Sequence, residues 1–169
     1  MIFNETVLAA TQSVFEFNDV AGNLSNVTYN TIDDQISYIF EELCETIDSI
    51  DPHRQSLIEG NFPANYDINE ALVNKTELLD GACDLFVTVV GLLQKLEAKG
   101  YDVGTALQRV CANNLTKFPE TNQPVGYDRR FTCTINEKYN RYVIKDESGK
   151  VRKHQGFEQV DLFDLIPQH

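Results

Sequence analysis

The sequence predicts a mainly helical protein with a small β-hairpin near its C-terminus. Apolar residues recur at helical spacing through most of residues 1–118, whereas residues 131–144 are rich in aromatic and β-branched residues with partial alternation. The chain has 169 residues, of which 42% are hydrophobic. This length and composition are typical of one soluble globular domain that can bury a core.

Four helices are expected, and their ends are marked by polar N-cap residues, by glycine and by proline. Their expected ranges are 5–19, from an N-cap at Thr31 to 51, 68–98, and from an N-cap at Asp102 to 118. Residues 53–67, between the second and third helices, contain Gly, Pro and Asn without a sustained period. A loop of this length is a candidate lid or binding loop.

The C-terminal part differs in pattern from the helical part. The hairpin is expected to pair residues 131–135 with 139–144, and a turn is expected at 147–150. Residues 160–167 are expected to form a short apolar anchor that packs on the helical domain or on another subunit. We therefore expect a helical domain over residues 1–128. The basic hairpin and tail, residues 129–169, should pack on that domain or on a neighbouring subunit.

Charge is distributed unevenly along the chain. The net charge is −12, which argues against a nucleic-acid backbone or an anionic membrane as partner. Residues 1–128 carry 20 acids and 6 bases, whereas residues 129–153 carry 8 bases and 3 acids. The basic segment could dock on a neighbour or lean over a polyanionic ligand, or it could be a solvated hairpin.

Two acidic clusters stand out. The run EELCE gives Glu41 and Glu45 about 40° apart on a helix, with Glu42 beside them, and ELLDGACD gives a second stripe of Glu77, Asp80 and Asp84. Like charges at this spacing repel one another. A divalent cation held by oxygen ligands would compensate them.

The alternative is that both stripes are ordinary solvated helix faces, because each helix also has an apolar stripe roughly opposite its acids. The absence of charge mixing weighs against it, since residues 33–51 contain seven acids and no Lys or Arg. On sequence alone both interpretations stay open. The expected apolar stripes are Ile36, Ile39, Phe40, Leu43, Ile47 and Ile50 in the second helix, and Ala82, Leu85, Phe86, Val89, Leu92, Leu93 and Leu96 in the third.

The fourth helix contributes a possible phosphate-binding pair. Asn114 and Lys117 project at nearly the same angle as the inward stripe of Val103, Ala106, Leu107 and Val110. An amide and an ammonium aimed inward would suit a phosphorylated ligand that bridges metal and cation. The alternative is that they make favourable last-turn contacts at the end of the helix.

Nothing in the sequence predicts secretion or membrane insertion. No apolar run approaches the roughly 18 residues that span a bilayer, and the N-terminus MIFNETVLAA lacks the basic start of a signal peptide. The four cysteines lie singly on separate segments, which favours reduced packing thiols. We therefore expect a cytoplasmic protein.

The acidic motifs resemble those of the MazG-like superfamily of all-α nucleoside triphosphate pyrophosphohydrolases, whose signature is EExxE followed by ExxD. EELCE fits the first half, but the residue three before Asp84 is Gly81, so that Asp80 or Glu77 would replace the missing acid. A bacteriophage-type branch is more similar. It has DGxxD before an apolar helix, an NxxK pattern matched by Asn114 and Lys117, and a late GKVxK segment matched by residues 149–153.

The resemblance implies a four- to five-helix bundle and Mg²⁺-dependent cleavage between the α and β phosphates of a (deoxy)nucleoside triphosphate, with Mn²⁺ as a possible substitute. It also implies a homodimer or homotetramer with the site near the subunit interface. A phage enzyme acting on purine dNTPs such as dGTP or dATP, in the host cytoplasm, is one form of this hypothesis. The implied catalytic residues are Glu41, as general base, and Glu42. The implied metal ligands are Glu42, Glu45, Glu77, Asp80 and Asp84, and the implied substrate-binding residues are Asn114, Lys117, Lys150 and Lys153.

Two other functions are compatible with the sequence. One is phosphoribosyl-ATP pyrophosphohydrolase, which shares the helical scaffold, and the other is a non-catalytic helical protein whose acidic stripe docks on a basic partner. The sequence does not fix the nucleobase. Phe17, Tyr66 and Tyr127 are candidates for stacking on it.

Overall fold

The computed structural model describes residues 2–51, 68–122 and 124–168, and within them the chain forms four α-helices and one β-hairpin. The expected lid, residues 53–67, and the candidate Tyr66 lie outside the described residues. Residues 1–103 with 167–169 form one compact unit, and residues 104–166 form a second. We describe each unit by itself. Among the described helices, none is both long and apolar enough to cross a membrane.

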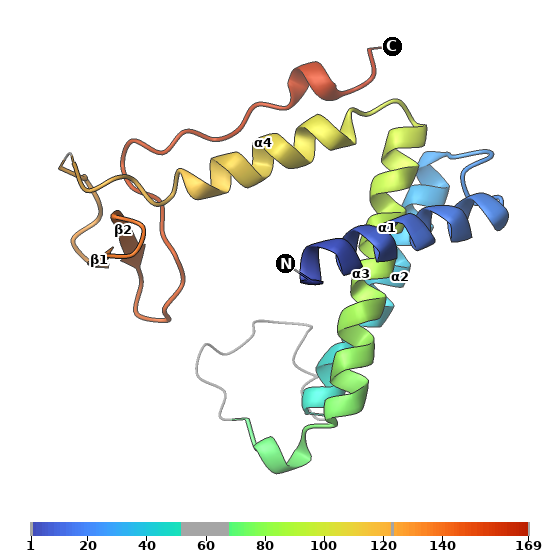
Figure 1. The fold of residues 1–169 in the computed structure, drawn as a ribbon, viewed down its shortest axis with the longest axis horizontal. Coiled ribbons are helices and arrows are strands. Elements are labelled where there is room, and N and C mark those ends of the chain that lie inside the picture. Colours follow the sequence, from blue (N-terminus) through green and yellow to red (C-terminus); the bar gives the residue numbers. More distant parts are fainter. Residues whose placement is uncertain (1, 52–67, 123, 169) are drawn as a thin grey trace. The chain divides into compact units, whose positions relative to one another are not determined.

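The first unit is built on two long antiparallel helices (Figure 1). Helix α2 spans Tyr29–Ile50, and helix α3 spans Lys75–Ala98. Contacts along their length fix the pairing, because Gln35 Nε2 donates to the Thr88 carbonyl at 3.0 Å and Lys95 Nζ donates to the Thr31 carbonyl at 2.9 Å. Helix α1, Ile2–Val20, contacts α3.

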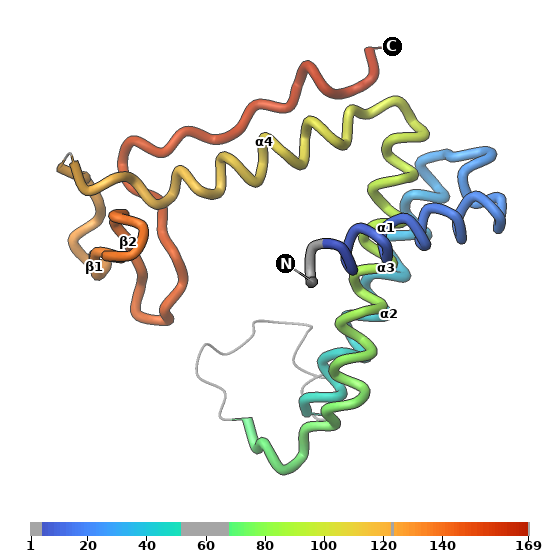
Figure 2. The backbone as a smooth tube through the Cα atoms, in the orientation of Figure 1, coloured from blue at the N-terminus to red at the C-terminus, as the bar shows by residue number. Residues whose placement is uncertain are grey.

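Three predicted helix starts were wrong. Helix α1 begins at Ile2, three residues before the expected start at residue 5. Helix α2 begins at Tyr29 because Thr28 is its N-cap, and Thr31 is instead the third residue of the helix and closes a capping box with Thr28. Helix α3 begins at Lys75 and not at residue 68, because the Asn74 side chain accepts from the Glu77 amide at 3.3 Å. The short 3₁₀ turn η2, Glu70–Leu72, precedes it (Figure 2).

The predicted helix ends were close. Helix α2 ends at Ile50 with Asp51 as its C-cap, and α3 ends at Ala98. Gly100 follows with a φ of 92°, a left-handed conformation that glycine adopts without steric cost, so its predicted role as a stop is confirmed.

The second unit contains helix α4, Val103–Leu115, which begins directly after Asp102 and has nearly all of its length in this unit. The hairpin is confirmed: β1, Thr132–Asn136, pairs antiparallel with β2, Arg141–Lys145, and Cys133 lies opposite Ile144. Ile144 is fully buried. The C-terminal anchor contains the 3₁₀ turn η3, Phe163–Leu165, of which Leu165 is buried.

The line of contact between α2 and α3, which we call the seam, includes several polar and small residues. Gln35 and Ser49 of α2 are buried there, as are Gly81 and Gly91 of α3. A Cβ added to Gly81 would lie 2.5 Å from Thr46 Oγ1, so the glycine lets the two helices approach closely at this point.

The expectation that the apolar stripes of both helices face inward was wrong for several members. Ile36 is 50% exposed and Phe40 55% exposed on α2, and Phe86 and Val89 are exposed on α3. Buried apolar residues of this unit include Val14, Ile32, Ile47 and Val90. Of the expected stripes, Ile47 is buried as predicted, but Gln35, Ser49, Gly81 and Gly91 are buried at positions that the stripes did not include.

Candidate functional site

The seam brings the two acidic clusters together. One hollow of about 260 Å³ between α2 and α3, which we call the acidic groove, is bordered on both sides by carboxylates. Its lining residues are Glu45, Asp48, Glu77, Asp80, Gly81 and Asp84. The close approach at Gly81 therefore places five carboxylates around one small space.

Glu42 lies at the edge of this cluster, and the neighbouring carboxylates raise the pKa of its carboxyl group. Burial raises the pKa of the Glu42 carboxyl above its ordinary value, and the negative charges of Asp84, Glu45, Glu41 and Asp80 raise it further. Contributions from both helices show that Glu42 lies in the common electrostatic field of the two clusters. Glu42 and Asp84 are half-buried, whereas the other acids of the two stripes, Glu41, Glu45, Glu77 and Asp80, are exposed.

The acids of the groove lack positive partners within the described part of the chain. The salt bridges described there join other residues, in the second unit, such as Arg109 with Asp164 and Arg152 with Asp146. Asp48 Oδ1 is buried and makes no hydrogen bond to a described residue. A buried oxygen of this kind costs free energy unless it finds a donor or a cation.

Asp48 is the groove residue that our sequence-based site assignment missed. Its signal was present in the chain, because Asp48 lies three positions after Glu45 and so extends the same stripe by one helical turn. It appeared in the sequence only as one of seven acids without a neighbouring base.

The donor chemistry of the groove fits a hard divalent cation such as Mg²⁺, which prefers carboxylate oxygens. The buried Asp48 oxygen supports this fit. In the arrangement seen, however, no three Asp, Glu, His or Cys side chains among the described residues stand close enough to form a complete set of metal ligands. Rotation of the carboxylates about their side-chain bonds would be needed to close around an ion.

A second hollow, of about 230 Å³, adjoins the acidic cluster through Glu41 and Glu42, and we call it the amide pocket. Asn18 Nδ2 donates to Gln94 Oε1 at 2.7 Å, and Asn23 Nδ2 donates to Asn18 Oδ1 at 2.9 Å. Its lining residues are Phe17, Asn18, Asn23, Gln35, Tyr38, Glu41, Glu42, Val87, Thr88 and Gly91.

The amide pocket combines fixed polar groups with exposed aromatic rings. Asn18 and Gln35 are buried, as is Gln94, the partner of Asn18 outside the lining, whereas Phe17 and Tyr38 remain largely exposed at 64% and 52%. Sequence reasoning proposed Phe17 as a stacking candidate but missed the three amides. Each of these amides is a polar residue at a helix position that faces a neighbouring helix.

The predicted substrate-binding residues all belong to the second unit. Lys117 Nζ donates to Asn114 Oδ1 at 2.7 Å, and Asn114 is exposed, so within this unit the pair does not point into a core. Lys153 Nζ lies 4.6 Å from the centre of the Phe157 ring, and the Lys150 amide donates to Asp146 Oδ1 at 3.0 Å. Their approach to the acids of the first unit stays a prediction.

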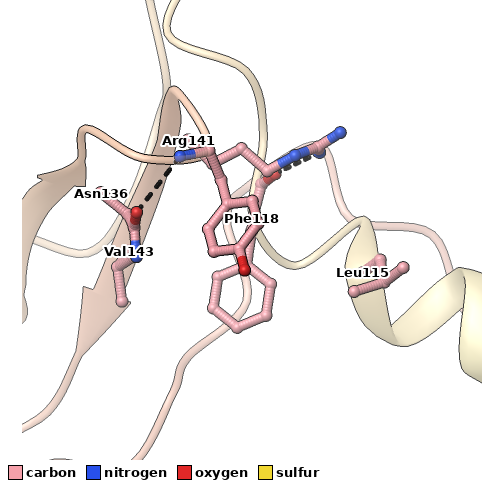
Figure 3. A pocket seen from close by; sticks show the side chains of 6 residues that line it. Leu115, Phe118, Asn136, Arg141 and Val143 are labelled. Carbon is pink, nitrogen blue, oxygen red and sulfur yellow. Dashed lines mark hydrogen bonds between the residues drawn. The ribbon is translucent and has the colours of Figure 1, made fainter. Parts of the chain in front are cut away.

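The second unit has a hollow of its own, of about 420 Å³, between the end of α4 and the hairpin (Figure 3). Arg141 Nη1 donates to the Phe118 carbonyl at 2.7 Å, and Arg141 Nη2 lies 3.6 Å from Glu120 Oε1. The guanidinium is therefore already engaged with the protein. The walls are Leu115, Phe118, Asn136, Tyr139, Arg141 and Val143, and they are mainly apolar.

Comparisons of the chain with protein-family models, with curated proteins and with solved structures found no match.

Proposed function

We propose that the protein is a Mg²⁺-dependent (deoxy)nucleoside triphosphate pyrophosphohydrolase of the all-α type that works in the cytoplasm. The observation that carries the proposal is the acidic groove, in which five carboxylates from two helices surround one hollow. Carboxylates gathered in this way, without a base among the lining residues, need a compensating cation. A nucleoside triphosphate is a substrate whose hydrolysis commonly requires such a cation.

The groove acids divide into ligands and a proton acceptor. Glu42, Glu45, Glu77, Asp80 and Asp84 would hold one or more Mg²⁺ ions, and Asp48 is added to this set because its buried oxygen is unpaired. When bound, the metal would neutralise the triphosphate and make a bound water more acidic. Glu41, which is exposed beside Glu42, would accept the proton of the attacking water.

In the proposed reaction, water adds to phosphorus and the α–β anhydride bond breaks. The bridging oxygen leaves with the bonding electron pair, and the products are a (deoxy)nucleoside monophosphate and pyrophosphate. Asn114, Lys117, Lys150 and Lys153 are proposed to bind phosphate oxygens and to stabilise the charge that develops on pyrophosphate. This role requires the second unit, of the same chain or of a neighbour, to reach the groove.

The amide pocket supports a nucleotide as the substrate class. Amide side chains recognise the edges of a nucleobase by hydrogen bonds, and aromatic rings stack on its face. Asn18 and Gln35 provide the amides, while Phe17 and Tyr38 provide the rings, next to Glu41 of the acidic cluster. A purine deoxynucleotide remains the specific substrate that we propose.

The decisive experiment measures pyrophosphate release from a panel of nucleoside triphosphates with Mg²⁺ or Mn²⁺. Turnover that requires metal and disappears in Asp84→Asn supports the proposal. A matched control is Glu97→Gln, since Glu97 is an exposed acid on the same helix outside the groove, and this variant should retain the parent activity. No turnover of any nucleotide, together with no stabilisation by metal, would favour an acidic interaction protein instead.

A further inference from the structure

The outer edge of strand β2 is paired with other segments of the second unit. The Tyr142 amide donates to the Pro119 carbonyl at 2.9 Å, and the Arg152 amide donates to the Ile144 carbonyl at 2.8 Å. These bonds show that the backbone groups of Tyr142 and Ile144 point away from β1. Strand β2 therefore has backbone partners on both of its sides.

Strand β1 differs, because its outer edge has no backbone partner within the described part of the chain. Ile135 lies opposite Tyr142, and Cys133 lies opposite Ile144. In an antiparallel ladder, two opposite residues either exchange their backbone hydrogen bonds or both direct their groups outward. Since Tyr142 and Ile144 direct their groups outward on β2, Cys133 and Ile135 direct theirs outward on β1. Two amides and two carbonyls are thus free to bond to a further strand.

The sequence of β1, TCTIN, lacks the usual protection of an exposed edge strand. Such strands are commonly kept from pairing with other chains by Lys, by Pro or by a bulge. Strand β1 has no charged residue and no proline, and its register with β2 is continuous. Its Thr and Ile residues are β-branched and favour extended backbone. The edge is therefore suited to accept a further strand.

The hollow of about 420 Å³ between the end of α4 and the hairpin, which we call the hairpin hollow, borders the same sheet. Asn136 of β1, Val143 of β2 and Leu115 of α4 are among its walls (Figure 3). Leu115 is 65% exposed and Tyr139 is 63% exposed, so the described chain leaves these apolar walls uncovered. Because side chains alternate between the faces of a sheet, every second side chain of an added strand would lie on the face of Asn136 and Val143.

Basic residues flank both ends of β1. Residues 129–145 contain five bases and one acid. Arg129 lies three positions before Thr132, and Lys145 lies opposite Thr132; both bases are exposed and form no salt bridge with a described residue. Lys138 lies beyond the other end of β1, with its Nζ 5.1 Å from the centre of the Tyr139 ring. A peptide with acidic ends and an apolar centre complements this surface.

We propose that β1 binds an extended acidic peptide of another protein, which becomes the third strand of the sheet. The Cys133 and Ile135 amides donate to carbonyls of the peptide, and their carbonyls accept from its amides. One apolar side chain of the peptide enters the hairpin hollow, and its carboxylates lie near Arg129 and Lys145. Backbone pairing provides affinity, while the hollow and the bases select the sequence.

Hydrogen exchange of the full chain, followed by NMR, tests the backbone pairing. The probe is a capped synthetic peptide of sequence EETVTFTVEE. With the peptide at about ten times its dissociation constant, about a tenth of the chains stay free, so the Cys133 and Ile135 amides should exchange about tenfold more slowly. The Tyr142 amide is the internal control and should change much less, because it already donates to the Pro119 carbonyl.

Two altered peptides separate backbone pairing from charge. The phenylalanine must lie on the face of the hollow, so the amides of its two neighbours point to β1. The peptide EETVPFPVEE replaces these neighbours by proline, which cannot donate, and it should not bind. The peptide KKTVTFTVKK keeps the apolar centre and reverses the charge, and it should bind about tenfold more weakly than EETVTFTVEE.

Ile135→Pro tests the same edge from the protein's side. Proline is tolerated on an edge strand where its nitrogen faces solvent, so the amide signals of β2 should show an intact hairpin while EETVTFTVEE no longer binds. Ile135→Val is the matched control, since it keeps the amide and the β-branched side chain, and it should bind as the parent does. If Ile135→Pro disturbs the hairpin, the comparison of EETVTFTVEE with EETVPFPVEE on the parent protein decides.

Three outcomes overturn the proposal. Equal binding of EETVTFTVEE and EETVPFPVEE would mean that charge alone attracts the peptide. No binding of EETVTFTVEE at millimolar concentration would mean that the edge does not accept a strand. Slow exchange of the Cys133 and Ile135 amides in the protein without peptide would mean that the edge is already covered, by the chain itself or by a second copy.

Discussion

The close contact at Gly81 determines whether α2 and α3 can bring their acids together, and Gly81→Ala tests it directly. A Cβ at this position would lie 2.5 Å from Thr46 Oγ1 and 3.3 Å from the Thr46 Cα atom. The first distance is not acceptable for a methyl group, and the second is tighter than an ordinary contact, to an atom in the backbone of the neighbouring helix. The substitution must therefore push the helices apart or twist the Thr46 side chain.

The expected change is a balance of two terms. Forcing a methyl group into a packed contact costs about 2 kcal/mol. Replacing glycine by alanine within a helix gains about 1 kcal/mol. We expect Gly81→Ala to lower the free energy of unfolding by about 1 kcal/mol, which corresponds to roughly 2–4 °C in melting temperature for a chain of this size.

Thr46→Ala is the partner variant. It removes Thr46 Oγ1, the atom nearest to the added Cβ, and with it the hydrogen bond that this oxygen donates to the Glu42 carbonyl at 2.7 Å. In the double variant most of the stability lost by Gly81→Ala should return, so that the two effects are strongly non-additive. The assay is thermal and urea unfolding of the metal-free protein, followed by circular dichroism.

Two outcomes would refute this reasoning. Gly81→Ala could be more stable than the parent by the full helix-propensity gain, which would mean that the helices are not in close contact there. Alternatively, Gly81→Ala and Thr46→Ala could be additive, which would mean that these two residues do not touch.

Four further predictions concern individual acidic residues. Glu42→Gln should abolish turnover without lowering the melting temperature of the metal-free protein, and a large fall in that temperature would instead make Glu42 structural. The folded state raises the pKa of Glu42 above its ordinary value of 4.5. The metal-free protein should therefore lose stability as the pH rises through the folded pKa of Glu42. Measurements of unfolding as a function of pH should show this loss, and Glu42→Gln should remove it. Asp48→Asn should weaken stabilisation by Mg²⁺, measured as the shift in melting temperature, more than Glu97→Gln does. Directly after β2, hydrogen bonds led by that from Ser148 lower the pKa of Asp146 to about 2. The contribution of Asp146 to stability, present above about pH 3.8, should therefore be lost as the pH falls through about 2. Asp146→Asn should remove this part of the acid titration, which NMR of the hairpin amides would follow.

Local sequence signals predicted the types of the elements better than their starts. The hairpin and the end of α3 at Gly100 could be predicted from nearby residues alone: β-branched residues in the strands and a glycine that can adopt the left-handed conformation. Helix starts depend on which polar side chain captures the free amides. Thr28 and Thr31 both suit that role by type, and the geometry selected Thr28.

The site was partly predictable for a related reason. Spacing alone placed Glu42 and Glu45 on one helix face and Asp80 and Asp84 on another, and the structure places these two faces along one groove. Which face would be buried was not predictable, because each helix has a polar stripe beside an apolar one. That choice depends on long-range packing, such as the close approach of Gly81 to Thr46.

The proposed cation site depends on how closely α2 and α3 approach each other at the seam. A seam of large apolar residues would hold the helices farther apart and would exclude carboxylates from the contact. At a seam that contains glycine, threonine and amide side chains, the helices are close enough for the charge of Asp84 on α3 to raise the pKa of Glu42 on α2.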